Sequence, residues 1–314
     1  MKNKIYLSII VLLIPLAIIS FNKEKKSAEN TTNLQDKNTI IVLKNNNEIT
    51  NIPLEEYVIG VVGAEVPALF LEETLKAQAI ASRTFALYQQ NHVGYLTLSD
   101  QAYNSKAELK AKWQDNYDKY YSKISKAVLD TKDLVLTYNN ELIKSYYYSM
   151  SNGYTESSLT VFNEDLPYLE IIPSIYDNET LNNFSTTITL TKEEFCSKLS
   201  ISCPNITISN IQKDKSNRIE SLIINNQKFL GTTIRTLLNL KSTDFTINLQ
   251  NNEVTITTKG YGHGVGMSQY GANGMAAAGK NYTEILNYYY KNIKIQKYIA
   301  VSYTHLTLPR IMLV

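Results

Sequence analysis

The sequence is poor in the side chains that bind metals and build disulfide scaffolds. Its 314 residues include two cysteines, Cys196 and Cys203, with three histidines and one tryptophan. Two cysteines cannot supply a disulfide framework or a four-cysteine zinc site. Six residues separate the pair, and we favour two packed thiols over a local disulfide or a share in a metal site.

The chain also lacks an excess of charge of either sign. There are 31 Lys and Arg against 29 Asp and Glu, a formal net charge of +2, so no strong electrostatic footprint for nucleic acid is present. Hydrophobic residues make up 44% and charged residues 19%, which argues against a wholly disordered, collagen-like or polytopic membrane protein. The length predicts one large domain or two small ones, with a flanking segment.

One long apolar run is present near the N-terminus, over residues 5–21, and lysines stand on both sides of it. Its length is near the short end of the roughly 17–25 residues that span a bilayer. Because no small-x-small cleavage site closes the run, we expect an uncleaved membrane anchor rather than an export signal that is removed. Residues 22–37 are polar and predict a linker that does not fold alone.

From residue 38 the pattern is that of an α+β domain. Two β-rich runs, 39–43 and 49–54, flank three asparagines and predict a hairpin. The helix that follows is expected to end near Ala64, because Pro67 disfavours helical geometry in the residue before it. Glu65 therefore lies at the end of a helix.

The rest of the chain continues this mixed pattern. Asn139 and Asn140 tolerate positive φ and predict a tight hairpin between two β-rich runs. Residues 186–258 read as short strands with two helical pieces and predict a β-rich subdomain inserted into a single large domain. Helices are expected over residues 72–88 and 107–131, and a last helix opens at residues 281–284 in the manner of a capping box. Strands are expected over residues 134–138, 142–148 and 293–298.

The least ordinary stretch is residues 260–272, in which every second position from 260 to 266 is glycine. On an extended segment such glycines leave one face free of side chains, where a backbone or a ligand can approach closely. Two interpretations stay open: tight packing against a neighbouring element, or a bare face that receives a ligand. The spacing does not match a dinucleotide-binding or P-loop motif.

Three blocks together carry a resemblance to a known family. They are EEYVIGVVGAEVP at 55–67, LKAQAIASRTFAL at 75–87, and GYGHGVGMSQYGANGMAAAG at 260–279. In this order and spacing they resemble the stage II sporulation protein D family, whose domain also occurs in proteins named for amidase enhancement. The resemblance implies a lytic transglycosylase that cuts the glycan strands of peptidoglycan, in septal wall remodelling during engulfment. It also implies partners of the stage II sporulation protein P and M types.

The resemblance covers about residues 39–298 and fixes the expected organisation. Residues 1–21 would form a short cytoplasmic end and a signal-anchor helix, and residues 38–299 a catalytic domain outside the cytoplasm on a single-pass membrane protein. The tail, residues 300–314, has no counterpart in the family. It resembles translated adapter read-through, and we assign it no function.

Glu65 matches the catalytic acid of the family's Glu-x-Pro motif. Cleaving a glycosidic bond needs a carboxyl with a raised pKa, and a helix C-terminus and apolar neighbours both raise it. No second carboxylate is tied to Glu65 by spacing, which suits a reaction in which the substrate's own C6 hydroxyl attacks. The alternative is a solvated glutamate on a non-catalytic module that binds the wall or activates an amidase.

Nine further residues are expected to contact substrate: Arg83, Gln101, Tyr103, Ser149, Ser151, Thr155, His263, Ser268 and Gln269. The pair Gln101 and Tyr103 matches a family Gln-x-Tyr, although a structural role is the common one for such residues. Arg83 either orients the acid or bridges the core. His263 either donates to a sugar hydroxyl or holds the glycine segment in shape, and the bare glycine face beside Glu65 would receive the glycan.

No metal or other cofactor is expected. Residues 148–156, YSMSNGYTE, match a family segment with two departures: Tyr148 stands where the family often has histidine, and Asn152 where it has glycine. Because histidine and cysteine are the usual zinc ligands, the missing histidine argues against a zinc site here.

Overall fold

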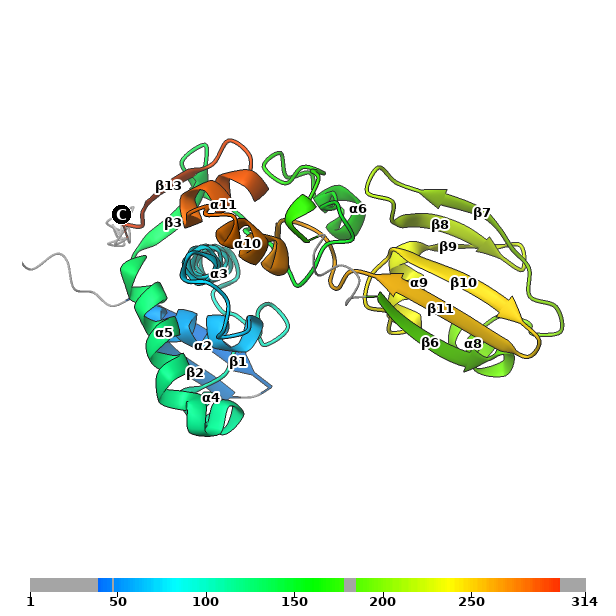
Figure 1. Cartoon of the computed structure of the whole chain (residues 1–314), viewed down its shortest axis with the longest axis horizontal. Coiled ribbons are helices and arrows are strands. Elements are labelled where there is room, and N and C mark those ends of the chain that lie inside the picture. The colour runs from blue at the N-terminus through cyan, green and yellow to red at the C-terminus, as the bar shows by residue number, and fades with distance from the viewer. Residues whose placement is uncertain (1–38, 47, 178–184, 300–314) are drawn as a thin grey trace, which may run out of the picture. The chain divides into compact units, whose positions relative to one another are not determined.

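A computed structural model describes residues 39–46, 48–177 and 185–299 as a mixed α+β protein (Figure 1). The expected anchor, linker and tail lie outside these residues. Within the described part of the chain, no helix is both long enough and apolar enough to cross a bilayer.

The N-terminal elements follow the sequence pattern closely. Strands β1 (Ile40–Asn45) and β2 (Glu48–Pro53) form the expected hairpin and lead into helix α2 (Leu54–Glu65). The helix ends because Val66 is extended, with φ −123° and ψ 152°, as its place before Pro67 requires. Glu65 is therefore the last residue of a buried helix.

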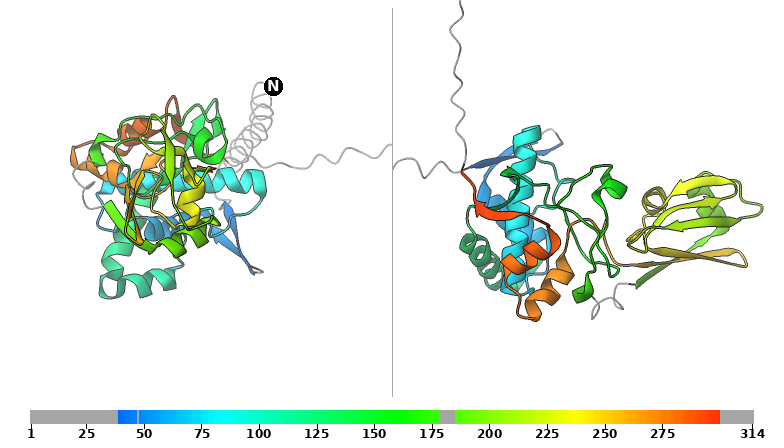
Figure 2. Two further views of the ribbon diagram at one scale, coloured as in Figure 1. Left: turned by 90° about the vertical axis from the view of Figure 1, so that its right-hand side faces the viewer. Right: turned by 90° about the horizontal axis from the view of Figure 1, so that it is seen from above.

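Helix α3 (Glu72–Val93) runs through the centre of the helical part of the protein (Figure 2). Its buried side chains contribute to two apolar cores, one shared with α2 and the other with the C-terminal helices. The elements that contact it most are α2, α5 (Tyr117–Asp130), β3 (Leu134–Tyr138), α10 (Gln269–Ala277) and α11 (Tyr282–Tyr289).

The expectation of one helix over residues 107–131 is wrong. The chain forms α4 (Lys106–Trp113), a short 3-10 turn and then α5, and it breaks at Gln114, where φ is +46°. The break allows Trp113 to pack against α2 at Gly63, where the missing side chain leaves room for the indole ring. Tertiary packing therefore overrides the local helical pattern.

The hairpin at Asn139 and Asn140 is confirmed, with both residues at positive φ. Its second strand, β4 (Glu141–Leu142), is short, because the expected run over 142–148 divides and resumes as β5 (Tyr147–Tyr148). Strand β5 pairs in parallel with β12 (Met267–Ser268) and so joins two distant parts of the chain. Strand β13 (Lys294–Lys297) completes the sheet around β3.

Residues 185–259, here called the β-rich segment, form two three-stranded sheets that share one apolar core with two helices. The sheet β10–β11–β6 and the sheet β7–β8–β9 lie side by side in Figure 1. The elements are β6 (Ser185–Thr191), α8 (Lys192–Leu199), β7 (Ile208–Lys213), β8 (Ile219–Ile224), β9 (Gln227–Leu230), α9 (Gly231–Leu237), β10 (Phe245–Gln250) and β11 (Glu253–Lys259).

The two cysteines of this segment are joined to each other. Cys196 and Cys203 form a disulfide, with their Cα atoms 5.6 Å apart. The expectation of two packed thiols is therefore wrong. The bond ties the end of α8 to the loop that follows it.

Candidate active site

Glu65 lines a pocket of about 590 Å³. Aromatic side chains form one part of its wall, and polar side chains form another. The aromatic residues are Phe85, Tyr146, Tyr147, Phe162 and His263, and the polar ones include Gln89, Asp100, Gln101, Lys144 and Glu164. Such a mixed wall suits a polar ligand with apolar faces.

The Glu65 carboxyl is held by several donors. Its Oε1 accepts the backbone N–H of Ala102 at 2.9 Å and the hydroxyl of Tyr147 at 3.5 Å. Burial raises the pKa of Glu65, while the bonds from Ala102 and Tyr147, the nearby side chain of Gln269 and the charge of Lys112 oppose the rise. The result is an acid that keeps its proton to a higher pH than an exposed glutamate does.

A chain of hydrogen bonds connects this acid, through Tyr147 and Gln101, to Tyr57. The Gln101 Nε2 donates to the Tyr147 hydroxyl at 2.9 Å, and the Tyr57 hydroxyl donates to the Gln101 Oε1 at 3.3 Å. Burial, together with the charge of Glu65, raises the pKa of Tyr147 well above its usual value, so its phenol remains a donor. Gln101, expected as a substrate contact, is buried, and its side-chain bonds brace Tyr147 from behind.

Tyr103 also has a structural place. Its ring stacks on Tyr57, with centroids 5.3 Å apart and an angle of 8° between the planes. The same ring covers α2 at Gly60, where a side chain would collide with it. Tyr103 does not line the pocket.

Arg83 does not reach Glu65. Its guanidinium is fully buried and forms a two-pronged ion pair with Glu55, at 2.6 and 2.9 Å. It also donates to the carbonyls of Leu134 and Val128, at 3.1 Å each. The expectation of a substrate contact is corrected to the alternative: Arg83 bridges α2, α3 and β3 inside the core.

Three expected substrate contacts are buried side chains that hold loops together. Ser268 donates to Asp177 at 2.6 Å, and the N–H of Ser151 donates to the same carboxyl at 3.1 Å. Thr155 donates to the Glu170 carbonyl at 2.8 Å. These bonds are internal to the fold, because the three side chains are almost inaccessible to solvent. Ser149 is half-buried, and its carbonyl accepts the N–H of Tyr270.

His263 and Gln269 do come to the site. His263 lines the pocket, and its Nδ1 accepts the N–H of Val265 at 3.1 Å, which leaves the proton of the neutral ring on Nε2. Burial, followed by the charges of Arg235 and Arg218, lowers the pKa of His263 to about 3, although a hydrogen bond to the Tyr147 backbone opposes the change. The ring is therefore uncharged at neutral pH. Gln269, the first residue of α10, lies beside the acid, and its polar side chain opposes the rise in the pKa of Glu65.

The expected bare glycine face is wrong. A side chain at Gly264 would lie 2.8 Å from the Arg218 guanidinium, and one at Gly262 would lie 2.8 Å from Tyr148. A side chain at Gly266 would collide with the carbonyl of Tyr146. All three residues also have positive φ. The glycines allow tight packing against protein, which was the other interpretation.

Several site residues carry no signal in the sequence that marks them as part of a site. Tyr147, Tyr146 and Phe162 stand in no motif that separates them from the other aromatics in a chain with 23 tyrosines. Tyr147 comes to the acid through the parallel pairing of β5 with β12, a long-range contact. Among the described residues, no group of three or more His, Cys, Asp or Glu side chains is arranged to hold a metal ion.

Comparison with known proteins adds to this geometry. The family model described as "SpoIID: Stage II sporulation protein" matches residues 43–138. The chain is 38% identical to stage II sporulation protein D of Bacillus amyloliquefaciens, covering 88% of this chain and 83% of the relative. It is 41% identical to stage II sporulation protein D of Bacillus subtilis, covering 80% and 77%.

A third relative carries a different name. The chain is 29% identical to the amidase enhancer of Bacillus subtilis, covering 76% of this chain and 40% of that protein. The long matches at 38% and 41% identity decide the assignment. This chain belongs to the stage II sporulation protein D family.

Proposed function

We propose that this sporulation-family protein is a lytic transglycosylase that cleaves the glycan strands of peptidoglycan, with Glu65 as general acid and then general base. One observation carries the proposal: a carboxyl whose pKa is raised by burial lines a pocket with aromatic and polar walls. A protonated carboxyl in such a position is what the cleavage of a glycosidic bond needs.

The reaction needs one carboxyl that works twice. Because two donors converge on the Oε1 of Glu65, the acidic proton belongs on Oε2. That proton passes to the glycosidic oxygen as the bond to the anomeric carbon breaks. The C6 hydroxyl of the same sugar then attacks the anomeric carbon and returns its proton to Glu65, which forms an anhydro ring without consuming water.

The other carboxyls of the pocket are engaged elsewhere. Asp100 accepts the N–H and hydroxyl of Thr97, both at 2.7 Å, and the Gln89 amide. Glu164 forms an ion pair with Lys144 at 2.6 Å. Glu65 is therefore the pocket acid best suited to donate a proton, which favours a mechanism with a single carboxyl over one with two.

The aromatic wall supports a sugar substrate. Tyr146 and Phe162 stack with their ring centroids 4.4 Å apart, and His263 meets Phe162 edge to face at 5.2 Å. Their faces are suited to the apolar side of a pyranose ring, and the neutral imidazole and the Lys144–Glu164 pair to its hydroxyls.

Mass spectrometry of the products tests the proposal. Purified glycan strands incubated with the protein are expected to gain 1,6-anhydromuramic ends, because the C6 hydroxyl replaces water as the nucleophile. New reducing ends would indicate an ordinary hydrolase. Binding without new ends would favour a wall-binding or amidase-activating module on the same fold.

We also propose a cellular setting: septal wall remodelling during engulfment, with partners of the stage II sporulation protein P and M types, on the outer side of the membrane. The apolar run over residues 5–21 supports membrane attachment. The disulfide between Cys196 and Cys203 suits an oxidising location outside the cytoplasm.

Fractionation tests the membrane attachment. The full-length protein is expected to stay with membranes after washing with carbonate or high salt, because burial of the run in lipid far exceeds attraction between surface charges. A variant lacking residues 1–21 serves as the control and is expected in the wash. A soluble extracellular species beginning near Asn22 would instead identify a cleaved signal.

A further inference from the structure

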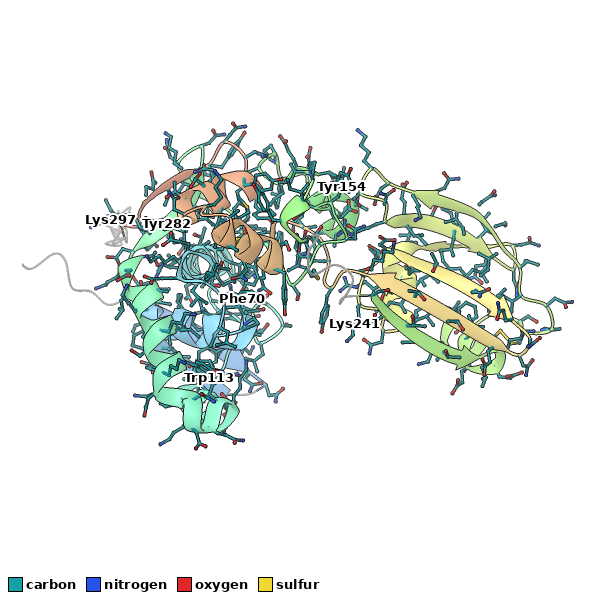
Figure 3. The ribbon with its side chains drawn as sticks, viewed as in Figure 1. Phe70, Trp113, Tyr154, Lys241, Tyr282 and Lys297 are labelled. Atoms are coloured by element: carbon teal, nitrogen blue, oxygen red, sulfur yellow. A yellow bond between two sulfur atoms is a disulfide. The ribbon has the colours of Figure 1, made fainter. Side chains whose placement is uncertain are left out.

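A buried polar junction connects the β-rich segment to the segment that carries His263. On one side is the turn between β7 and β8, residues 214–218, and on the other are residues 152–156. Tyr154, labelled in Figure 3, belongs to the second side, and Lys241, also labelled there, lies in the β-rich segment and accepts the N–H of Gly262 through its carbonyl. The glycine segment 260–266 packs against both.

Arg218 is the centre of the junction. It is 2% exposed and donates to the carbonyl of Tyr154 at 2.9 Å, while its Nη1 lies 3.9 Å from the Glu156 carboxyl. Asn152 adds a second link, because its amide nitrogen donates to the Ser216 carbonyl and to the Asp244 carboxyl, each at 2.9 Å. The residue that replaces a family glycine thus serves as a tie to the β-rich segment.

Two carboxyls at this junction share one hydroxyl. The Ser216 Oγ lies 2.6 Å from the Glu156 Oε2 and 2.6 Å from the Asp214 Oδ1. A hydroxyl has a single proton and can donate to only one of these oxygens. The Asp214 Oδ1 also accepts the backbone N–H groups of Ser216 and Arg218, at 2.7 and 3.0 Å. A second hydrogen bond at the Ser216 hydroxyl therefore needs a proton from a carboxyl, and burial, which raises the pKa of Glu156, favours Glu156 as its holder.

The junction leads directly to the pocket. The backbone N–H of Glu156 donates to the Gly264 carbonyl at 2.7 Å, and the space beside Gly264 is filled by Arg218 and Glu156. The next residue, Val265, donates its N–H to the His263 ring. The imidazole, which also bonds to the backbone of Tyr147, is thus oriented in part by a segment that the junction supports.

We infer that Glu156 and Asp214 are positioning residues: they share one proton across the junction and thereby hold the glycine segment that presents His263 to the pocket. The shared proton neutralises part of a buried charge cluster that includes Arg218. Any effect of the pair on catalysis rests on the proposed function. The proton sharing and its effect on the segment do not.

The charged groups around Glu156 fix the direction of the pH effect. Asp214 and Arg218 both face it from the β7–β8 turn, and Arg218 in turn acts on His263 and on Arg235 of α9. Burial, followed by the bond to Asp214, raises the pKa of Glu156 to about 7. The pKa of Glu156 is thus higher in the folded protein than in the unfolded chain. The protonated side chain therefore stabilises the junction fully below about pH 4.5, and this stabilisation is lost as the pH rises through about 7.

Hydrogen exchange tests the inference in the whole protein. Exchange of amides over residues 258–268 is measured by mass spectrometry at several pH values between 4.5 and 8, in the native chain and in Glu156→Gln. The glutamine stays neutral and keeps the shape of the side chain. The ratio of opening constants, native over variant, is expected to rise by up to about tenfold per pH unit as far as about pH 7, and then to level off. Dividing the native opening constant by that of the variant at the same pH removes the intrinsic pH dependence of amide exchange.

A matched control and a second variant complete the test. Glu170→Gln changes an exposed glutamate between Glu156 and the glycine segment. This variant is expected to exchange as the native protein does at every pH. If Glu156→Gln fails to fold, Asp214→Asn is used, since it also removes one carboxyl of the pair. A ratio that stays constant with pH would overturn the inference. The readout needs no substrate, so it is independent of whether Glu65 is the catalytic acid.

Discussion

Glu65→Gln is expected to reduce cleavage of purified glycan strands by about 10²–10⁴-fold, the contribution typical of a positioned acid. The amide keeps the size of the side chain and a hydrogen-bonding oxygen, but it has no proton to transfer. Formation of anhydromuramic ends, followed by mass spectrometry, measures the loss. Binding of the strands is expected to persist, because the pocket walls are unchanged.

The melting temperature of the same variant is a second measurement, and the direction of its change can be predicted. Burial raises the pKa of Glu65, so ionisation of the native carboxyl weakens the fold as the pH rises. Glu65→Gln is therefore expected to melt at the same or a higher temperature than the native protein at neutral pH. Glu56→Gln, an exposed change on the same helix, serves as the control and should keep full activity. Undiminished cleavage by Glu65→Gln would remove Glu65 from the catalytic role.

Arg83→Met is expected to cause the largest loss of stability, about 3–5 kcal/mol, as is typical when one partner of a buried ion pair is removed. The change leaves Glu55 without its cation and the carbonyls of Leu134 and Val128 without their donor. For a chain of this size the loss corresponds to about 2–4 °C of melting temperature per kcal/mol. Thermal melting followed by circular dichroism measures it.

The activity of Arg83→Met separates the two roles considered for this residue. A core bridge predicts that cleavage falls only with the folded fraction. Lys280→Met, which breaks an exposed ion pair with Glu284, is the control and should leave melting nearly unchanged. A variant that folded normally yet did not cleave would show that Arg83 acts at the pocket after all.

The elements with local signals were predictable from the sequence. Pro67 ends α2, Asn139 and Asn140 make the hairpin turn, and Asn281 caps α11 through a reciprocal bond with Glu284. In each case the residues that decide the geometry lie within a few positions of it. The break at Gln114 had no such signal, because it depends on how Trp113 packs on a different helix.

The site was predictable only in part, for the same reason. The family resemblance points to Glu65, and its helix-end position follows from Pro67. The partners of the acid come from far along the chain: Ala102 is 37 residues away and Tyr147 is 82 residues away. Polar motif residues such as Ser151 and Ser268 resembled substrate contacts, but their bonds to Asp177 became visible only in three dimensions.

The β-rich segment begins and ends at adjacent points. Ser185 and Lys259, its first and last residues, are paired directly in the antiparallel ladder of β6 and β11, a separation of about 4.5–5.5 Å between Cα atoms. A stretch of chain with neighbouring ends behaves as a cassette, which can be lengthened, shortened or exchanged without rerouting the chain on either side. Within such a cassette, the turn at 214–218 and the contacts of Lys241 and Asp244 would be constrained by the junction, and the remaining surface would be free to diverge.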